Sequence, residues 1–251
     1  MARWVTTPKW IAITAAVTVA LLAPLIGFHV LEQFLIRDPR FVFNGPESGA
    51  NTLEVAGAGH VSPQVIEDVF AEDFGRSVYM VPLSDRRASL RTVDWVKDAS
   101  VARFWPNRVT VGVTERKPVA FVAVVSGHPL LIDEEGVLLE PGPDRFMLPL
   151  LRGASTLDPQ AVRRARVQLF QRLMTELGAA SSAISEADVS DPDNVKVKEP
   201  FSGRTVTLML GDRNFASRHQ NFINYYSEIH KRMANATVLD LRLEDRITVV
   251  Q

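Results

Sequence analysis

The longest hydrophobic segment of the chain lies near its N-terminus. No Asp, Glu, Lys or Arg occurs between Lys9 and Glu32, and residues 10–31 are rich in Ile, Val, Ala and Leu. At about 1.5 Å per residue, a helix of this length spans roughly 33 Å, which is enough to cross the hydrocarbon core of a membrane. A cleaved signal peptide has a shorter apolar core and a small-residue cleavage site. The pattern therefore predicts a retained transmembrane helix.

Residues 52–117 alternate between strand and helix patterns. A short strand is expected around Leu53–Val55, and Ser62 followed by Pro63 is a typical helix start. A second helix is expected from Ser84 to about Thr92. Residues 95–114 then alternate with period two on both sides of a tight turn at Pro106 and Asn107, which is the pattern of a β-hairpin. The expected order is strand, helix, helix, strand, strand.

Residues 118–251 predict a larger domain of short strands and two helices. Gly178 ends the first helix, which is expected from Pro159 to Leu177. Its expected apolar face consists of Val162, Ala165, Leu169, Leu173 and Leu177. The second helix, from Phe215 to Met233, carries an apolar stripe with the spacing of one helix face. Its members are Phe215, His219, Phe222, Tyr226, Ile229 and Met233. Strands on both sides of these helices make the fold class α+β.

The last strand is the most informative element of this domain for function. Two final strands are expected at Thr237–Leu243 and Arg246–Val250, joined by a turn at Glu244 and Asp245. An edge strand at the end of the chain exposes backbone N–H and C=O groups, which can pair with a strand from another protein. The alternative is an edge protected by Arg246 and by the chain terminus.

Composition narrows the function classes further. The chain has 28 Lys and Arg against 29 Asp and Glu, so it is close to neutral and carries no basic stripe for nucleic acid. It has no cysteine, which excludes disulfides, thiol nucleophiles and cysteine-bound metals.

The sequence contains no convincing set of catalytic or metal-binding residues. His219 and His230 share a helix but are spaced too widely for a zinc pair, and we expect them to be helix-surface or partly packed histidines. Asp133–Gly136 lacks the spacing of a calcium loop and is expected to be a hairpin loop. The arginines at positions 163, 164 and 166 are most simply a solvated helix face, with contact to a partner or anionic lipid as the alternative. We therefore expect no catalytic residues, metal or cofactor.

Several segments resemble the FtsQ/DivIB family of cell division proteins. Residues 53–57 and 61–63 resemble the start of that family's POTRA domain, and residues 95–120, with Trp105-Pro106-Asn107 and Glu115-Arg116-Lys117-Pro118, resemble its junction with the β domain. Residues 131–136 and 238–243 resemble the first and near-terminal strands of the β domain. The resemblance covers nearly the whole chain.

The resemblance implies a domain order and a location. Expected segments are a cytoplasmic tail at 1–9, the transmembrane helix at 10–31, a linker at 32–51, a POTRA domain at 52–117 and an FtsQ-type β domain at 118–251. The Lys and Arg bias around the helix is weak and favours a cytoplasmic N-terminus. The family implies a cytoplasmic N-terminus, periplasmic domains, and a position in the inner membrane at the division septum.

The resemblance also implies a non-enzymatic role in the divisome. A family member binds FtsB and FtsL in a ternary complex and links early and late division proteins, so that septal peptidoglycan synthesis is regulated. FtsB adds a strand to the last strand of the β domain and contacts the last helix. Carried over to this sequence, the partner-binding residues are Arg242, Leu243, Arg246, Ile247, Thr248, Val249, Val250 and Tyr226. Other division proteins are expected at the POTRA domain.

Two other functions compete with this interpretation. A POTRA-containing envelope assembly factor would carry several POTRA repeats and usually a β-barrel, whereas this chain has one candidate repeat and too few residues for a barrel. A membrane-tethered hydrolase would need a nucleophile and base or a metal site, and the sequence shows neither.

Overall fold

A computed structural model describes residues 9–124, 127–232, 236–243 and 246–250. Its chain divides into two compact units, residues 1–115 and 116–251. The expected tail at 1–9 lies almost wholly outside the described residues, as do Val125, Met233 and the expected turn at Glu244 and Asp245.

Unit 1 begins with the long apolar helix α1 (Lys9–Arg37). Trp10–Arg37 is long and apolar enough to cross a membrane, and it is one such helix within the described part of the chain. Its side chains between Trp10 and Leu31 are exposed, as a helix that is covered by lipid requires. Pro24 lies inside the helix, where a membrane span tolerates it. α1 continues past Leu31 as far as Arg37.

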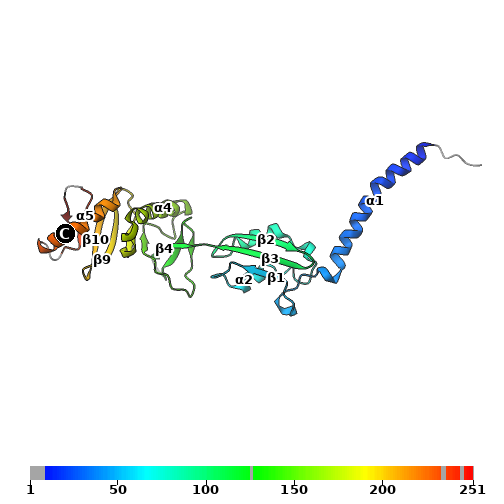
Figure 1. Ribbon diagram of the computed structural model, residues 1–251, viewed down its shortest axis with the longest axis horizontal. Helices are drawn as coiled ribbons and strands as arrows, with labels where there is room; N and C mark the ends of the chain where they lie inside the picture. Colours follow the sequence, from blue (N-terminus) through cyan, green and yellow to red (C-terminus); the bar gives the residue numbers. More distant parts are fainter. Residues whose placement is uncertain (1–8, 125–126, 233–235, 244–245, 251) are drawn as a thin grey trace, which may run out of the picture. The chain divides into compact units, whose positions relative to one another are not determined.

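The rest of unit 1 has the expected order of strand, helix, helix, strand, strand. Its sheet has the order β1-β3-β2, with β1 parallel to β3 and β2 antiparallel to it (Figure 1). The buried positions on β3 are Val109, Val111 and Val113, as their alternation predicts. The elements are β1 (Leu53–Ala56), α2 (Pro63–Val69), η3 (Val78–Met80), α3 (Leu83–Leu90), β2 (Val96–Phe104) and β3 (Arg108–Glu115).

Residues between α1 and β1 are part of this fold. Two short 3-10 helices occur there, η1 (Pro39–Phe41) and η2 (Pro46–Ser48). Between them, Phe43 is fully buried and its ring lies against those of Phe70 and Phe74. The segment expected to be a linker therefore supplies a core residue to unit 1.

Glu115, the last residue of β3, holds the loop between β1 and α2. One of its carboxylate oxygens accepts the backbone N–H groups of Gly59, His60 and Val61 at 2.8, 2.8 and 2.9 Å. The other lies 2.7 Å from Nδ1 of His60, whose ring stacks on the ring of Trp95. Burial of Glu115 opposes its ionisation, but these hydrogen bonds outweigh burial and hold its pKa below the usual value.

Unit 2 contains one mixed sheet, in which the described strands have the order β12-β11-β10-β9-β8-β7-β4-β5-β6. β10 pairs antiparallel with β9 and parallel with β11, so β11 returns to the sheet after a helix. The strands are β4 (Pro118–Val122), β5 (Leu130–Asp133), β6 (Leu138–Leu139), β7 (Leu150–Arg152), β8 (Glu186–Asp188), β9 (Val195–Phe201), β10 (Arg204–Gly211), β11 (Val238–Asp240) and β12 (Thr248–Val249).

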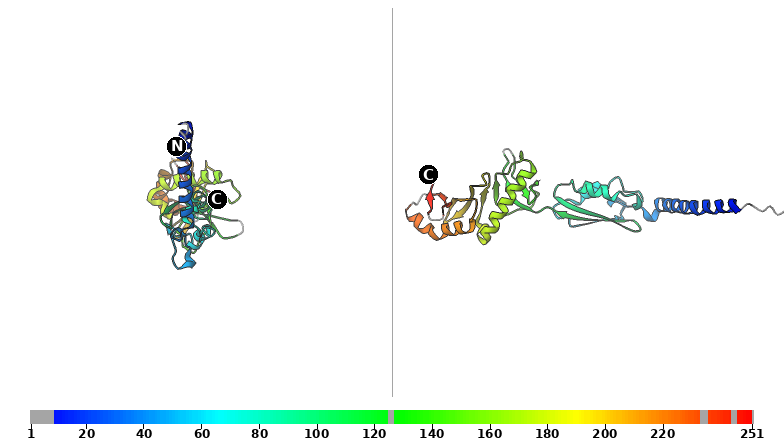
Figure 2. Two further views of the ribbon diagram at one scale, coloured as in Figure 1. Left: turned by 90° about the vertical axis from the view of Figure 1, so that its right-hand side faces the viewer. Right: turned by 90° about the horizontal axis from the view of Figure 1, so that it is seen from above.

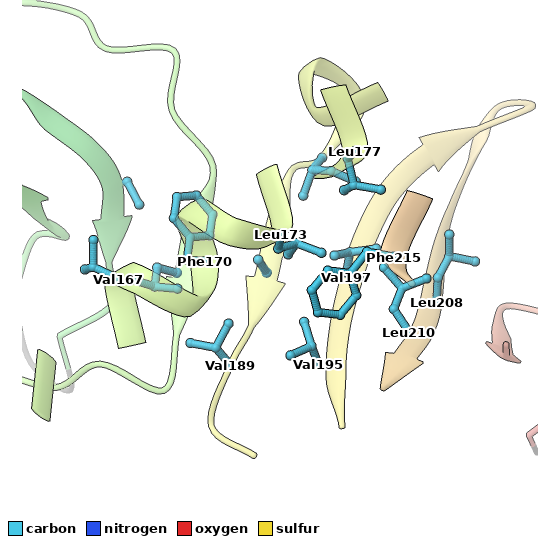
Figure 3. Close-up of a cluster of buried hydrophobic side chains, with 14 of the residues drawn as sticks. Val167, Phe170, Leu173, Leu177, Val189, Val195, Val197, Leu208, Leu210 and Phe215 are labelled. Carbon is cyan, nitrogen blue, oxygen red and sulfur yellow. The ribbon is translucent and has the colours of Figure 1, made fainter. Parts of the chain in front are cut away.

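Two helices cover one face of this sheet. α4 (Gln160–Leu177) and α5 (Phe215–Arg232) lie on the same side of the strands (Figure 2). Figure 3 shows their side chains meeting the inward residues of β9 and β10, with Leu173 and Phe215 between helix and sheet. Val197 and Leu208 are 1% and 0% exposed, so the alternating strands supply a continuous apolar face.

The expected apolar face of α4 is wrong at its N-terminal end. Val162 and Ala165 are exposed, whereas Val167 and Phe170 are buried together with Leu173 and Leu177. The helix is rotated so that Phe170, which has more apolar surface to bury than Val162, faces the sheet. Leu169 is only partly buried at the margin of the core.

The basic cluster on α4 also differs from the expected solvated face. Arg163 donates to the carbonyls of Gly136 and Asp158 at 2.8 and 2.5 Å, and Arg166 donates to the carbonyl of Val189 at 2.7 Å. These two side chains tie the helix to neighbouring loops, and Arg164 alone of the three is exposed.

Candidate partner-binding edge of the β domain

The candidate site lies where the sheet of unit 2 ends, at β12. β12 pairs antiparallel with β11, with Leu239 opposite Val249 and Asp240 opposite Thr248. Among the described residues no strand follows β12 on its other side. The strand was expected to span Arg246–Val250, and in the structure the strand itself is shorter, Thr248–Val249.

Side chains of this segment alternate between the core and solvent. Ile247 and Val249 are half-buried and pack against the core, whereas Arg246, Thr248 and Val250 are exposed. The core side chains fix which way the strand faces, because a shift by one residue would move them to the solvent side.

Backbone groups alternate in the other plane, toward β11 or away from it. The N–H of Val250 donates to the carbonyl of Val238 at 3.0 Å. In an antiparallel ladder, hydrogen-bonded and non-hydrogen-bonded pairs alternate, so Thr248 also exchanges its bonds with β11. The N–H and C=O of Val249 therefore point to the free side of the sheet, where they could bond to an added strand.

An ion pair lies at the end of β11 beside this edge. The Arg242 guanidinium bonds to the Asp240 carboxylate at 2.5 to 3.1 Å and holds the pKa of that carboxyl below its ordinary value. Arg242 is exposed, as is Leu243, which follows it and is 54% exposed. A charged and an apolar side chain, Arg242 and Leu243, thus follow directly after β11, the strand that pairs with β12.

Tyr226 belongs to α5 and packs toward the sheet. Its ring lies edge-on to Phe201 and Phe222, at centroid distances of 4.5 and 5.4 Å, and stacks on His230. The exposed residues of α5 include Ile223 and Tyr225. The structure thus places Tyr226 in an aromatic cluster on the inner face of α5, and Tyr226 packs against the same core as Ile247 and Val249.

One buried polar pair was not expected from the sequence. His219 is 6% exposed, and its Nε2 lies 2.9 Å from a carboxylate oxygen of Glu199 on β9, which is 1% exposed. Of the two expected positions, helix surface or partly packed, His219 takes the packed one and is buried more deeply than expected, because the helix stripe that contains it faces the sheet. The apolar neighbours of His219 in that stripe were the available signal. No group of three or more possible metal ligands occurs among the described residues.

Two family models match consecutive parts of the chain. Residues 48–116 match the POTRA domain of FtsQ type, and residues 120–242 match the C-terminal domain of the cell division protein FtsQ/DivIB. The second match includes β11 and Arg242 and ends before β12.

Curated relatives give the same result. The chain is 36% identical over 205 residues to a cell division protein FtsQ of Koribacter versatilis, a match of 79% of this chain and 59% of the relative. It is 33% identical over 107 residues to the FtsQ of Zymomonas mobilis, which covers 41% of this chain and 33% of that protein. It is 24% identical over 226 residues to the FtsQ of Nitrosospira multiformis, with 88% of both chains covered. The matches thus span less than two thirds of the length of the first two relatives.

A POTRA domain behind a candidate membrane helix, followed by a helix-covered mixed sheet, defines a class of POTRA-bearing proteins with two folded domains. Both domains match family models of the same protein family, in the same order. The chain belongs to the FtsQ/DivIB family of cell division proteins.

Proposed function

We propose that the chain is a non-enzymatic scaffold of the divisome that binds FtsB and FtsL through its β domain. In this proposal α1 crosses the inner membrane once, residues 1–9 are cytoplasmic, and the POTRA domain (52–117) and β domain (118–251) are periplasmic. Family membership supports the role in division. The partners, the orientation and the regulation of septal peptidoglycan synthesis are the proposed part.

The observation that carries the binding proposal is the backbone orientation of Val249. Its N–H and C=O point away from β11 at an edge that a further strand could join. Addition of a strand from FtsB would extend the sheet by main-chain hydrogen bonds, as in other cases of β-augmentation. Exposed Thr248 and Val250, with Arg242 and Leu243 beside them, would give side-chain contacts.

Val249→Pro tests this edge directly. Proline lacks the N–H group, and at Val249 that group faces the free side, so the pairing of β12 with β11 is retained. We expect loss of co-purification with the FtsB–FtsL complex, with an unfolding midpoint of the β domain no lower than that of Val249→Ala, which also shortens this half-buried side chain.

Val249→Ala is the matched control, because it shortens the side chain and keeps the donor. Retained binding in Val249→Ala and lost binding in Val249→Pro support strand addition. Equal binding in both variants would rule out pairing at this position, and equal loss would show that the side chain rather than the backbone is required.

A further inference from the structure

Exposed apolar side chains gather at the turn between β2 and β3. Phe104 and Trp105 are 54% and 53% exposed, and Met80 at the end of η3 is 54% exposed. Arg103 connects these two segments, since it donates to the carbonyls of Val78, Tyr79 and Val81 at 2.7 to 2.9 Å. Together, Met80, Phe104 and Trp105 form what we call the turn patch.

The turn patch is held next to the end of α1. The ring of Phe41 lies edge-on to Trp105 at 5.5 Å and meets Phe34 of α1 at 5.6 Å. In addition, the hydroxyl of Ser77, just before η3, donates to the carbonyl of Leu35 in α1 at 2.6 Å. Two segments of the POTRA domain are thus attached to the last turns of the candidate membrane helix.

The position along α1 gives the depth of the patch. If residues 10–31 fill the hydrocarbon core, Phe34 lies about 4.5 Å beyond it, at about 1.5 Å per helical residue. The headgroup layer on each side is roughly 5–7 Å thick, so Phe34 falls within it. Trp105 is reached from Phe34 through a single intervening ring, Phe41, and lies close to the same layer.

The chemistry of the surroundings suits this layer. The Arg40 guanidinium lies over the rings of Phe34 and Phe41 at 5.5 and 6.0 Å, paired with Asp38, and Arg37 is exposed at the end of α1. Aromatic residues with a polar edge are enriched at the membrane interface, and arginine binds phosphate groups through paired hydrogen bonds.

We propose that the turn patch docks into the headgroup layer of the membrane that α1 crosses, so that the POTRA domain rests directly on the lipid. The proposal depends on the proposed role of α1 as a membrane anchor. It adds a lipid-binding surface to a domain whose proposed partners are proteins.

A single-cysteine label can test the docking, because the chain has no cysteine of its own. The full chain carrying Met80→Cys, labelled with an environment-sensitive fluorophore, is placed in nanodiscs of phosphatidylethanolamine and phosphatidylglycerol that contain a lipid with a headgroup-level quencher. The reference site is Thr114→Cys, an exposed position at the opposite end of β3 from the turn. We expect quenching at position 80 and none at position 114.

The substitution Phe104→Glu places a charge in the turn patch and should abolish the quenching at position 80. Val65→Glu is the matched control: Val65 is an exposed apolar residue on α2, just after the loop held by Glu115, and its change should leave the quenching intact. Circular dichroism of each variant reports whether the fold is retained.

Each of the other outcomes would contradict one part of the proposal. Failure of the protein to enter the nanodiscs would overturn the anchor role of α1. Entry without quenching at position 80, or equal quenching at positions 80 and 114, would overturn the docking alone. Quenching that survives Phe104→Glu would also contradict the turn patch as its cause.

Discussion

In several loops of this protein, one charged side chain forms hydrogen bonds to two or more backbone groups. Arg103 donates to three carbonyls around η3, and Glu115 accepts three N–H groups before α2. Arg163 and Arg166 bind loop carbonyls in unit 2 in the same way. Charged residues, which a sequence pattern assigns to solvent, therefore act here as connections between elements.

Replacement of Arg103 should destabilise unit 1. Arg103→Met keeps much of the apolar stem but removes the donor to the carbonyls of Val78, Tyr79 and Val81, of which Val78 keeps the N–H of Val81. The loss should lower the free energy of unfolding by about 2 kcal/mol. All four tryptophans precede residue 116, so tryptophan fluorescence during urea unfolding follows unit 1 alone.

Arg91→Met is the control for this change. Arg91 is 55% exposed and forms a surface ion pair with Asp98, so its loss should cost only a few tenths of a kcal/mol. Equal destabilisation by the two substitutions would mean that the carbonyl bonds of Arg103 contribute no more than a surface charge.

The lowered pKa of Glu115 predicts a pH dependence. A carboxyl with a folded-state pKa below its unfolded value contributes stability above that value, near 4.5, and loses the contribution as pH falls through the folded pKa. Unit 1 should therefore lose stability below about pH 4.5. Glu115→Gln should be less stable at neutral pH and show a flatter decline in acid, measured by tryptophan fluorescence. A decline as steep as that of the original chain would contradict a role for Glu115.

At the level of elements, strand patterns predict more than helix patterns do. A strand has two faces, and the alternation of Val109, Val111 and Val113 leaves one solution for β3. On α4, two overlapping stripes share Leu173 and Leu177, and only packing against the sheet selects the one with Phe170 over the one with Val162. The choice depends on long-range contacts, which local spacing does not contain.

Paired substitutions on α4 test the observed face. Leu173→Ala removes a fully buried side chain and should cost about 2–5 kcal/mol, whereas Val162→Ala, at a position 41% exposed, should cost less than about 1 kcal/mol. Urea unfolding followed by circular dichroism gives both values. Similar losses of unfolding free energy at the two positions would contradict the observed face of α4 and favour the face expected from the sequence.

The free edge of the β domain was predictable only in part. The location of a last strand follows from the pattern of residues 246–250, but the direction of each backbone group does not. That direction depends on the register between β11 and β12, in which Val250 bonds to Val238. The choice of Val249 as the position to disrupt therefore comes from the structure and not from the sequence pattern.

For the whole molecule, the proposed membrane attachment changes how the proposed binding should be judged. If α1 crosses the membrane, partners with their own membrane helices would meet this protein on a surface, where the effective concentration is higher than in solution. A modest affinity at a two-residue edge strand would then be sufficient for assembly. Binding measured with isolated domains should accordingly be weaker than binding in a shared membrane.

A fluorescent fusion to the N-terminus tests the division role in cells. We expect a band at midcell during constriction, because a divisome scaffold follows its partners to the septum. A fusion that lacks residues 10–37 should lose this band if membrane attachment is required. Uniform envelope fluorescence of the full chain throughout division would contradict the proposed role.

Glu115 and Arg116 are neighbours in sequence but belong to different folding units. Glu115 fastens the loop before α2, and Arg116 bonds to Asp133 at 2.6 Å and to Glu135 at 3.0 Å. A fragment of unit 1 that ends at residue 114 would expose three N–H groups that the chain normally satisfies, and a fragment of unit 2 that starts at 117 would leave buried Asp133 without its cation. For expressing either domain alone, the boundary is therefore the peptide bond between Glu115 and Arg116.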